Sequence, residues 1–90
     1  MKTLLKLGDL KKGMDAKVIS VNSTSEELTR RILEMGILEG SSIRVVHLAP
    51  LGGDPIAVQV RGALIALRKQ EAQAIAVELR SSRQEEEYSG

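Results

Sequence analysis

The chain has 90 residues, of which 42% are hydrophobic and 1% aromatic, and its 13 Lys and Arg nearly balance its 12 Asp and Glu. This length predicts a single domain. A net charge of +1 argues against a broad nucleic-acid-binding surface, and the near absence of aromatic rings argues against base stacking. The lack of cysteine excludes disulfides, thiol catalysis and Cys-type zinc sites.

The chain also lacks a candidate membrane segment. Charged residues interrupt the apolar N-terminus, and no stretch approaches the ~18 apolar residues that a spanning helix needs. We therefore expect no direct membrane insertion, and any link to a membrane would run through a partner.

The first forty residues predict an extended lead-in, a strand and the main helix. Residues 4–10 precede a turn at Gly13, and the β-branched run 16–21 predicts a strand. Thr24 and Glu27 form a capping box at the start of a helix over 25–35. Apolar residues at i, i+4 and i+7 give that helix one buried face. Gly36 is expected to end it with positive φ, and Gly40 to form a second turn.

The second half predicts four more strands, at 43–48, 56–61, 64–68 and 75–79. Prolines bracket the loop 49–55, Gly62 turns the chain between the third and fourth strands, and residues 69–74 form a short helical turn. Short strands at this spacing predict an all-β fold, a small antiparallel barrel of five strands with one α-helix. This domain is expected over residues 1–80, followed by a disordered acidic tail over 81–90.

No motif in the sequence indicates an enzyme. Gly52 and Gly53 are the only paired glycines, but no phosphate-binding pattern surrounds them, so a hairpin turn explains them better. The single histidine, His47, does not fit a Ser–His–Asp arrangement. We therefore expect no catalytic residues and no bound cofactor.

A metal site has weak support in the sequence. A ferrous site favours several histidines with carboxylates, whereas His47 is expected on the same strand face as Ile43 and Val45. The weak candidates are His47, Glu34 and Asp54, with Glu71 as a further carboxylate. Fe²⁺ or another divalent transition metal is the ion that they would hold.

Two segments are candidates for contact with a protein partner. Arg30 and Arg31 lie on the helix, where they form either a solvated face paired with Glu26 and Glu27 or, with Glu34, a docking surface. The loop residues Leu51, Gly52, Gly53 and Asp54 form the second candidate, because an apolar loop tip on a rigid scaffold favours binding.

Three segments also occur in a specific order: Arg30 to Gly40, Ala49 to Ile56 and Val60 to Ala72. Together they resemble the FeoA family (ferrous iron transport protein A), over about Leu7 to Leu79. The resemblance implies an SH3-like barrel in a cytosolic accessory protein, whose partner is the FeoB-type membrane GTPase that imports ferrous iron. Iron and GTP chemistry would then belong to that partner. Glu39 departs from the proline that the family commonly has before its second glycine.

Two other functions stay open at this point. The chain could be a transition-metal sensor or carrier, or a small barrel that binds RNA or the ribosome. Net charge and composition argue against nucleic acid as a partner. The sequence leaves open whether the chain forms a homo-oligomer.

Overall fold

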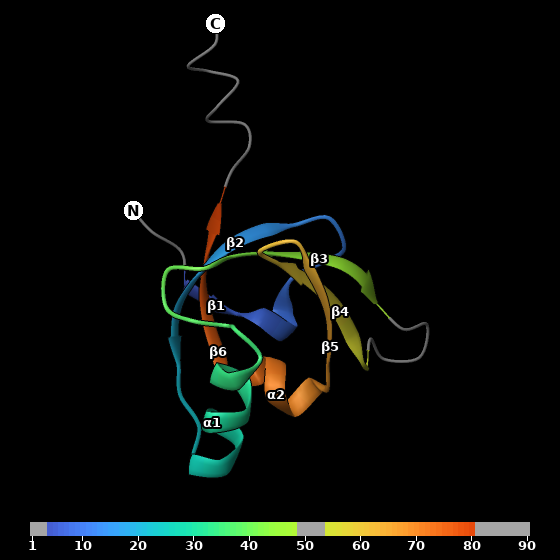
Figure 1. The fold of residues 1–90 in the computed structure, drawn as a ribbon. Coiled ribbons are helices and arrows are strands. Elements are labelled where there is room, and N and C mark those ends of the chain that lie inside the picture. The colour runs from blue at the N-terminus through green and yellow to red at the C-terminus, as the bar shows by residue number, and fades with distance from the viewer. Residues whose placement is uncertain (1–3, 49–53, 81–90) are drawn as a thin grey trace, which may run out of the picture.

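The computed structural model describes residues 4–48 and 54–80, and in this part of the chain six strands form one antiparallel sheet. Its strands are β1 (Leu4–Lys6), β2 (Asp15–Val21), β3 (Ser42–Leu48), β4 (Ile56–Val60), β5 (Ala63–Leu67) and β6 (Ile75–Arg80). They lie in the order β1-β6-β2-β3-β4-β5. The sheet curves around one core (Figure 1).

Three helical elements complete the fold. A 3₁₀ turn, η1 (Leu7–Asp9), follows β1, while α1 (Glu26–Glu34) connects β2 with β3 and α2 (Lys69–Gln73) connects β5 with β6. The two α-helices lie side by side at one end of the sheet (Figure 1). The predicted small antiparallel fold, its main helix and its short helical turn are confirmed.

The core is aliphatic and draws on every layer of the fold. Strand β4 is an example: Ile56, Val58 and Val60 are buried while Gln59 is exposed, as the alternating sequence predicts. The buried apolar residues are Leu7, Leu10, Ala16, Val18, Ile32, Ile37, Ile43, Val45, Ile56, Val58, Val60, Leu67, Ala72, Ala74, Ile75 and Val77.

The glycine predictions are confirmed, with φ of +91° at Gly36, +90° at Gly40 and +83° at Gly62. At Gly36 the left-handed backbone ends α1, and its N–H donates to the Leu33 carbonyl at 3.0 Å. Ile37 then enters the core together with Ile32. The turn at Gly62 begins one residue earlier than predicted, because Arg61 also has positive φ (+54°) and belongs to the turn rather than to β4.

Two predictions about the strands are wrong. The segment Leu4–Lys6, expected as an extended lead-in, pairs with β6 as a sixth strand. Its three residues are too few to show a clear alternation. In β3, a bulge between Val45 and His47 shifts the register. His47 is therefore exposed, while Ile43 and Val45 are buried, because the inserted residue turns it away from their face.

The predicted acidic tail and the loop residues Leu51, Gly52 and Gly53 lie outside the described residues. The structure therefore does not test the predictions made for them.

Candidate functional site

Helix α1 presents two of the predicted contact residues to solvent. Ile32 is buried and Leu28 is half-buried against the core, which fixes the rotation of the helix. Arg30 and Glu34, four residues apart on the opposite side, are exposed. Leu33 lies beside them and is 40% exposed. The outer face of α1 therefore combines both charges with an apolar side chain.

Arg31 has an intramolecular partner that the sequence did not predict. Its Nη2 lies 3.2 Å from Oε2 of Glu71, and the Arg31 side chain is 61% exposed whereas that of Glu71 is 4% exposed. Oε1 of Glu71 accepts a second bond, from the Arg68 N–H at 2.8 Å. A buried carboxylate needs such donors. Arg31 therefore joins α1 to α2, instead of pairing with Glu27 as expected.

Asp54 also has a structural contact. It is exposed, and its Oδ1 accepts from the N–H of Lys69, the first residue of α2, at 3.0 Å. A carboxylate at the start of a helix satisfies an amide that has no partner within the helix. Asp54 thus connects the segment just before β4 to the start of α2.

Three shallow hollows lie around α2, and two of them share Gln70 and reach from Arg31 on α1 to Asp54. One, of about 480 Å³, is lined by Asp54, Arg68, Lys69, Gln70 and Gln73. A second, of about 290 Å³, is lined by Ser23, Thr24, Ser25, Glu27, Leu28, Arg31 and Gln70. Because Gln70 lines both, α2 bridges the space between α1 and Asp54.

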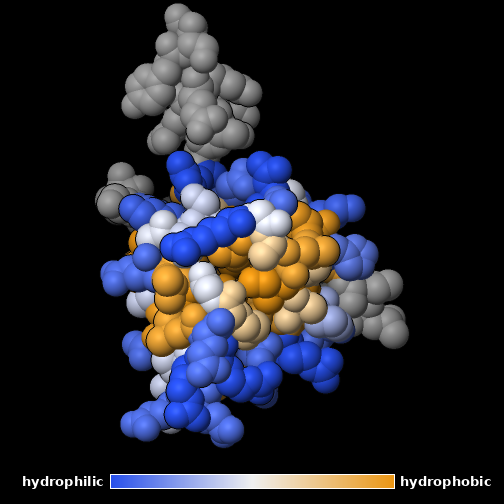
Figure 2. All heavy atoms as spheres, in the orientation of Figure 1, coloured by the Kyte–Doolittle hydropathy of each residue, from blue (hydrophilic) through white to orange (hydrophobic). Residues whose placement is uncertain are grey.

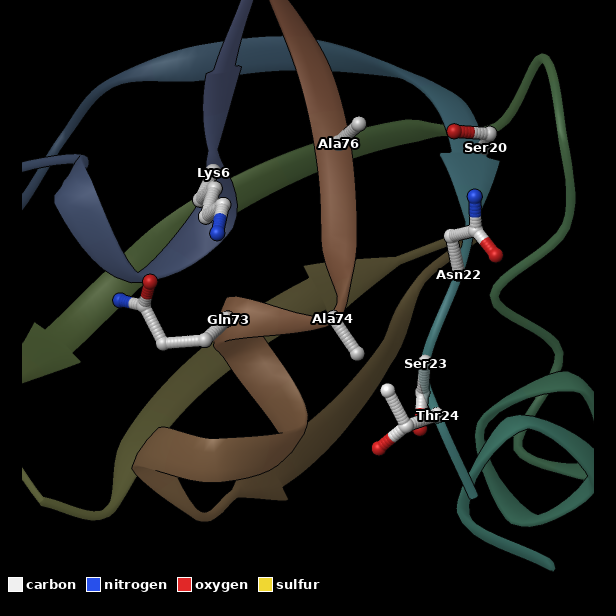
Figure 3. A pocket seen from close by; sticks show the side chains of 8 residues that line it. All are labelled: Lys6, Ser20, Asn22, Ser23, Thr24, Gln73, Ala74 and Ala76. Carbon is white, nitrogen blue, oxygen red and sulfur yellow. The ribbon is translucent and has the colours of Figure 1, made fainter. Parts of the chain in front are cut away.

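The third hollow, of about 410 Å³, shares Gln73 with the first. Figure 3 shows Lys6 and Gln73 on one side of Ala74 and Ala76, with Asn22, Ser20 and Thr24 on the other. Lys6 is the one charged side chain among its lining residues. Amides, hydroxyls and a single ammonium can form hydrogen bonds with a partner, but they offer no acid–base pair.

We define the α2 surface as Lys69, Gln70 and Gln73 with Asp54, and we add to it the exposed Arg30 and Glu34 of α1, the helix that the Arg31–Glu71 ion pair joins to α2. The sequence identified Asp54, Arg30 and Glu34 and missed the α2 residues. A short helix with several uncharged polar side chains between two strands was the available signal. It was weak, because such residues are typical of any solvated turn.

The three candidate metal ligands do not form a common site. Within residues 4–48 and 54–80, no group of three or more His, Cys, Asp or Glu side chains could hold a metal ion. His47 is on β3 beyond its bulge, Glu34 ends α1, and Asp54 binds the start of α2. These three residues therefore do not form a metal site within the described part of the chain.

A bidentate ion pair joins two neighbouring strands of the sheet. Asp15 of β2 accepts two bonds from Arg44 of β3, from Nε at 2.6 Å and from Nη2 at 2.9 Å. These hydrogen bonds, with the nearby positive charge of Arg80, hold the pKa of Asp15 below its usual value. Asp15 and Arg44 are directly paired in the ladder, so this contact fixes the register of β2 on β3.

The described part of the chain contains no helix that is long and apolar enough to cross a membrane.

Comparison with known proteins decides the family. The model of the FeoA domain matches residues 5–79. The chain belongs to the FeoA family. A FeoA-like protein from Clostridium acetobutylicum is 36% identical with a TM-score of 0.81, and the match covers 90% of this chain and 92% of that one. The predicted family resemblance is thereby confirmed.

A second solved FeoA comes from Stenotrophomonas maltophilia, where it is complexed with zinc and described as a prokaryotic SH3 domain protein. It is 35% identical with a TM-score of 0.72, and the match covers 81% of this chain and 88% of that one. The SH3-like fold expected of this FeoA chain is confirmed by that similarity.

A curated relative places a FeoA segment in a larger protein. The Fe(2+) transport protein A/Fe(2+) transporter FeoB fusion protein of Porphyromonas gingivalis is 37% identical over 78 residues, which are 87% of this chain. The chain spans 9% of the length of that relative.

Proposed function

We propose that this FeoA protein supports ferrous iron uptake by binding the cytosolic part of a FeoB-type membrane transporter. It acts from the cytoplasm and catalyses no reaction of its own. Ferrous iron is the cargo of the partner in this proposal, and GTP is the nucleotide that the partner uses.

The fusion relative is the observation that supports this proposal most directly. In the Porphyromonas gingivalis protein, sequence similar to this chain is joined to FeoB in one polypeptide. A covalent link raises the effective concentration of one domain near the other, to roughly the millimolar range for short linkers. Fusion is advantageous when the two domains act on each other, and a separate FeoA would have to bind FeoB to achieve the same effect.

The α2 surface is the contact region that we propose. It carries both charge signs, at Arg30 and Glu34, and its glutamines offer neutral donors and acceptors. The loop residues Leu51, Gly52 and Gly53 are proposed to extend it, since they directly precede Asp54 in the chain. Mixed charges of this kind are suited to orienting a partner rather than to providing most of the affinity.

A binding measurement tests the surface. The purified cytosolic part of the FeoB from the same organism is titrated with the wild-type protein and with an Arg30→Glu, Glu34→Lys variant, which keeps the net charge and the Arg31–Glu71 pair. We expect the exchange to weaken binding by about tenfold, because both charges then meet groups of the same sign. The matched control exchanges two exposed charges outside the α2 surface, Lys12→Glu with Glu39→Lys.

Equal weakening by both exchanges would contradict the proposed surface, although binding itself would stand. The function is tested separately, by ferrous uptake in a strain that lacks the gene. Uptake should fall and should be restored by the wild-type gene and by the control variant. Normal uptake in the deletion strain would contradict the proposed function.

A further inference from the structure

Strand β5 is an open edge of the sheet. Within the described residues it pairs with β4 alone and is the last strand in the order. Its five residues contain no charge, no proline and no bulge, although these are the features that usually protect an edge. The opposite edge, β1, has three residues and carries Lys6. The sheet is therefore protected at one edge and unprotected at the other.

Toward this edge, β5 directs backbone groups that have no strand partner among the described residues. Arg61 and Gly62, with φ of +54° and +83°, form a two-residue type I′ turn between Val60 and Ala63. In an antiparallel pair, alternate residues direct their N–H and C=O groups to opposite sides of the strand. Since Val60 and Ala63 close the turn, Leu64 and Ala66 are the residues whose backbone groups face away from β4.

The side chains of the same two residues are exposed to solvent. Leu64 is 71% exposed, more than any other large apolar residue in the described chain, and Ala66 is exposed. Figure 2 shows apolar atoms gathered on the face of the molecule that carries β5. A strand added at this edge would gain main-chain hydrogen bonds and would also cover apolar side chains.

The charges at the ends of β5 indicate what kind of strand fits. Arg61 precedes the strand, Arg68 and Lys69 follow it, and all three are exposed. If a second copy paired here with its apolar residues in register, Arg61 of one copy would approach Arg68 and Lys69 of the other. This would occur at both ends of the pair, and like charges opposite each other are destabilising. An acidic partner meets no such repulsion.

We propose that the β5 edge binds an extended segment of a protein partner that is apolar in its middle and acidic at both ends. The segment adds a seventh strand to the sheet, with main-chain bonds to Leu64 and Ala66 and ion pairs to Arg61, Arg68 and Lys69. This proposal rests on the edge and its charges and not on the FeoB assignment, although Lys69 belongs to both surfaces.

The test uses a synthetic peptide, EDVTVTVDE, and its counterpart KKVTVTVKK, titrated into the full isotope-labelled protein and followed by NMR. We expect the acidic peptide to shift the amide resonances of Leu64 and Ala66 most strongly and to slow their hydrogen exchange. Its affinity should fall as salt is added, since exposed charges are screened. The basic peptide should bind at least about tenfold more weakly, because its charges meet those of the edge.

Two variants separate the backbone from the charges. Ala66→Pro removes one outward N–H without removing a donor to β4. It should lower the affinity for the acidic peptide by up to about tenfold. Ala66→Val is its control and keeps that N–H. Because a proline variant can fail to fold, a second variant, Arg61→Glu with Lys69→Glu, leaves the backbone intact. It should reverse the preference between the two peptides.

Several results would overturn the proposal. Resonance shifts centred away from β5, equal binding of both peptides, or unchanged binding by the charge-reversed variant would each do so. A wild-type protein that dimerises in sedimentation experiments, and becomes monomeric as Ala66→Pro, would show that a second copy occupies the edge. In that case the occupant of the β5 edge would be a second copy of the chain and not an acidic partner.

Discussion

Glu71 is a carboxylate that this small domain buries almost completely, at 3% exposure. Its two donors come from different places in the chain, the side chain of Arg31 on α1 and the N–H of Arg68 before α2. A pair of basic residues on a helix suggested a docking surface, but the two differ in the structure. Arg30 is exposed and can meet a partner in solvent, whereas Arg31 connects two elements.

The Arg31–Glu71 contact predicts a specific loss of stability. Arg31→Met should lower the free energy of unfolding by about 1–2 kcal/mol, because the buried carboxylate loses a charged donor while the exposure of Arg31 moderates the loss. Glu71→Gln in the same background should recover part of this loss, since an amide needs no counter-charge. Urea denaturation of both single variants and the double variant measures the coupling. Additive effects would contradict the contact.

The Asp15–Arg44 pair predicts the behaviour of the domain in acid. Because the pKa of Asp15 is lowered on folding, this pair stabilises the native state above the ordinary Asp pKa. The contribution is lost progressively as the pH falls from about 4, the ordinary pKa of Asp, through the lowered pKa of Asp15 in the folded protein. NMR titration should find the pKa of Asp15 below that of an Asp in an unfolded peptide, and Arg44→Gln should raise it. An unchanged pKa in that variant would show that Arg44 does not cause the shift.

Helix α1 shows how an element can be predicted correctly while its first residue is not. The sequence pattern placed a capping box at Thr24 and Glu27, one residue too early. In the structure Ser25 is the N-cap, and its Oγ accepts from the Leu28 N–H at 3.2 Å. Four consecutive polar residues precede the helix, and several of them are good caps. The choice among them depends on the path of the chain from β2.

This assignment predicts a difference between neighbouring substitutions. Ser25→Ala should destabilise the protein by about 1 kcal/mol, because an amide of the first turn loses its acceptor. Thr24→Ala should change the stability by less than about 0.5 kcal/mol, as is usual for exposed positions without a special contact. Thermal and urea unfolding of the two variants provide the comparison. A larger loss of stability in Thr24→Ala than in Ser25→Ala would support the capping box at Thr24 instead.

The strands differ in how well the sequence predicted them, for reasons that lie in the individual residues. Strand β4 alternates cleanly, so both its bounds and its inward face could be read from the pattern to within one residue. The bulge in β3 left no trace in the sequence, because Val45, Val46 and His47 fit an ordinary strand equally well. His47 was therefore placed on the wrong face, with Ile43 and Val45, and that placement had counted against it as a metal ligand.

At the scale of the whole molecule, the core lies between Leu7 and Val77. We expect truncation after Arg80 to leave the fold and the unfolding free energy unchanged within about 0.5 kcal/mol, because every buried apolar residue of the described chain is kept. Calorimetry of the truncated and complete chains tests this expectation. A loss of cooperative unfolding in the truncated chain would contradict it and would give the last ten residues a structural function.

The sequence by itself determined the family, the small antiparallel fold, the main helix and the glycine turns. The fold, the helix and the turns depend on local patterns, namely strand alternation, helical spacing and glycines at positions such as Gly36, where φ is positive. The family resemblance depends instead on the order of three motif segments. The tertiary structure decided which residues meet, namely Arg31 with Glu71, and Asp54 with the start of α2. It also decided which strand lies at an open edge. Such pairings join residues far apart in the chain, where a single sequence contains no periodic signal to reveal them.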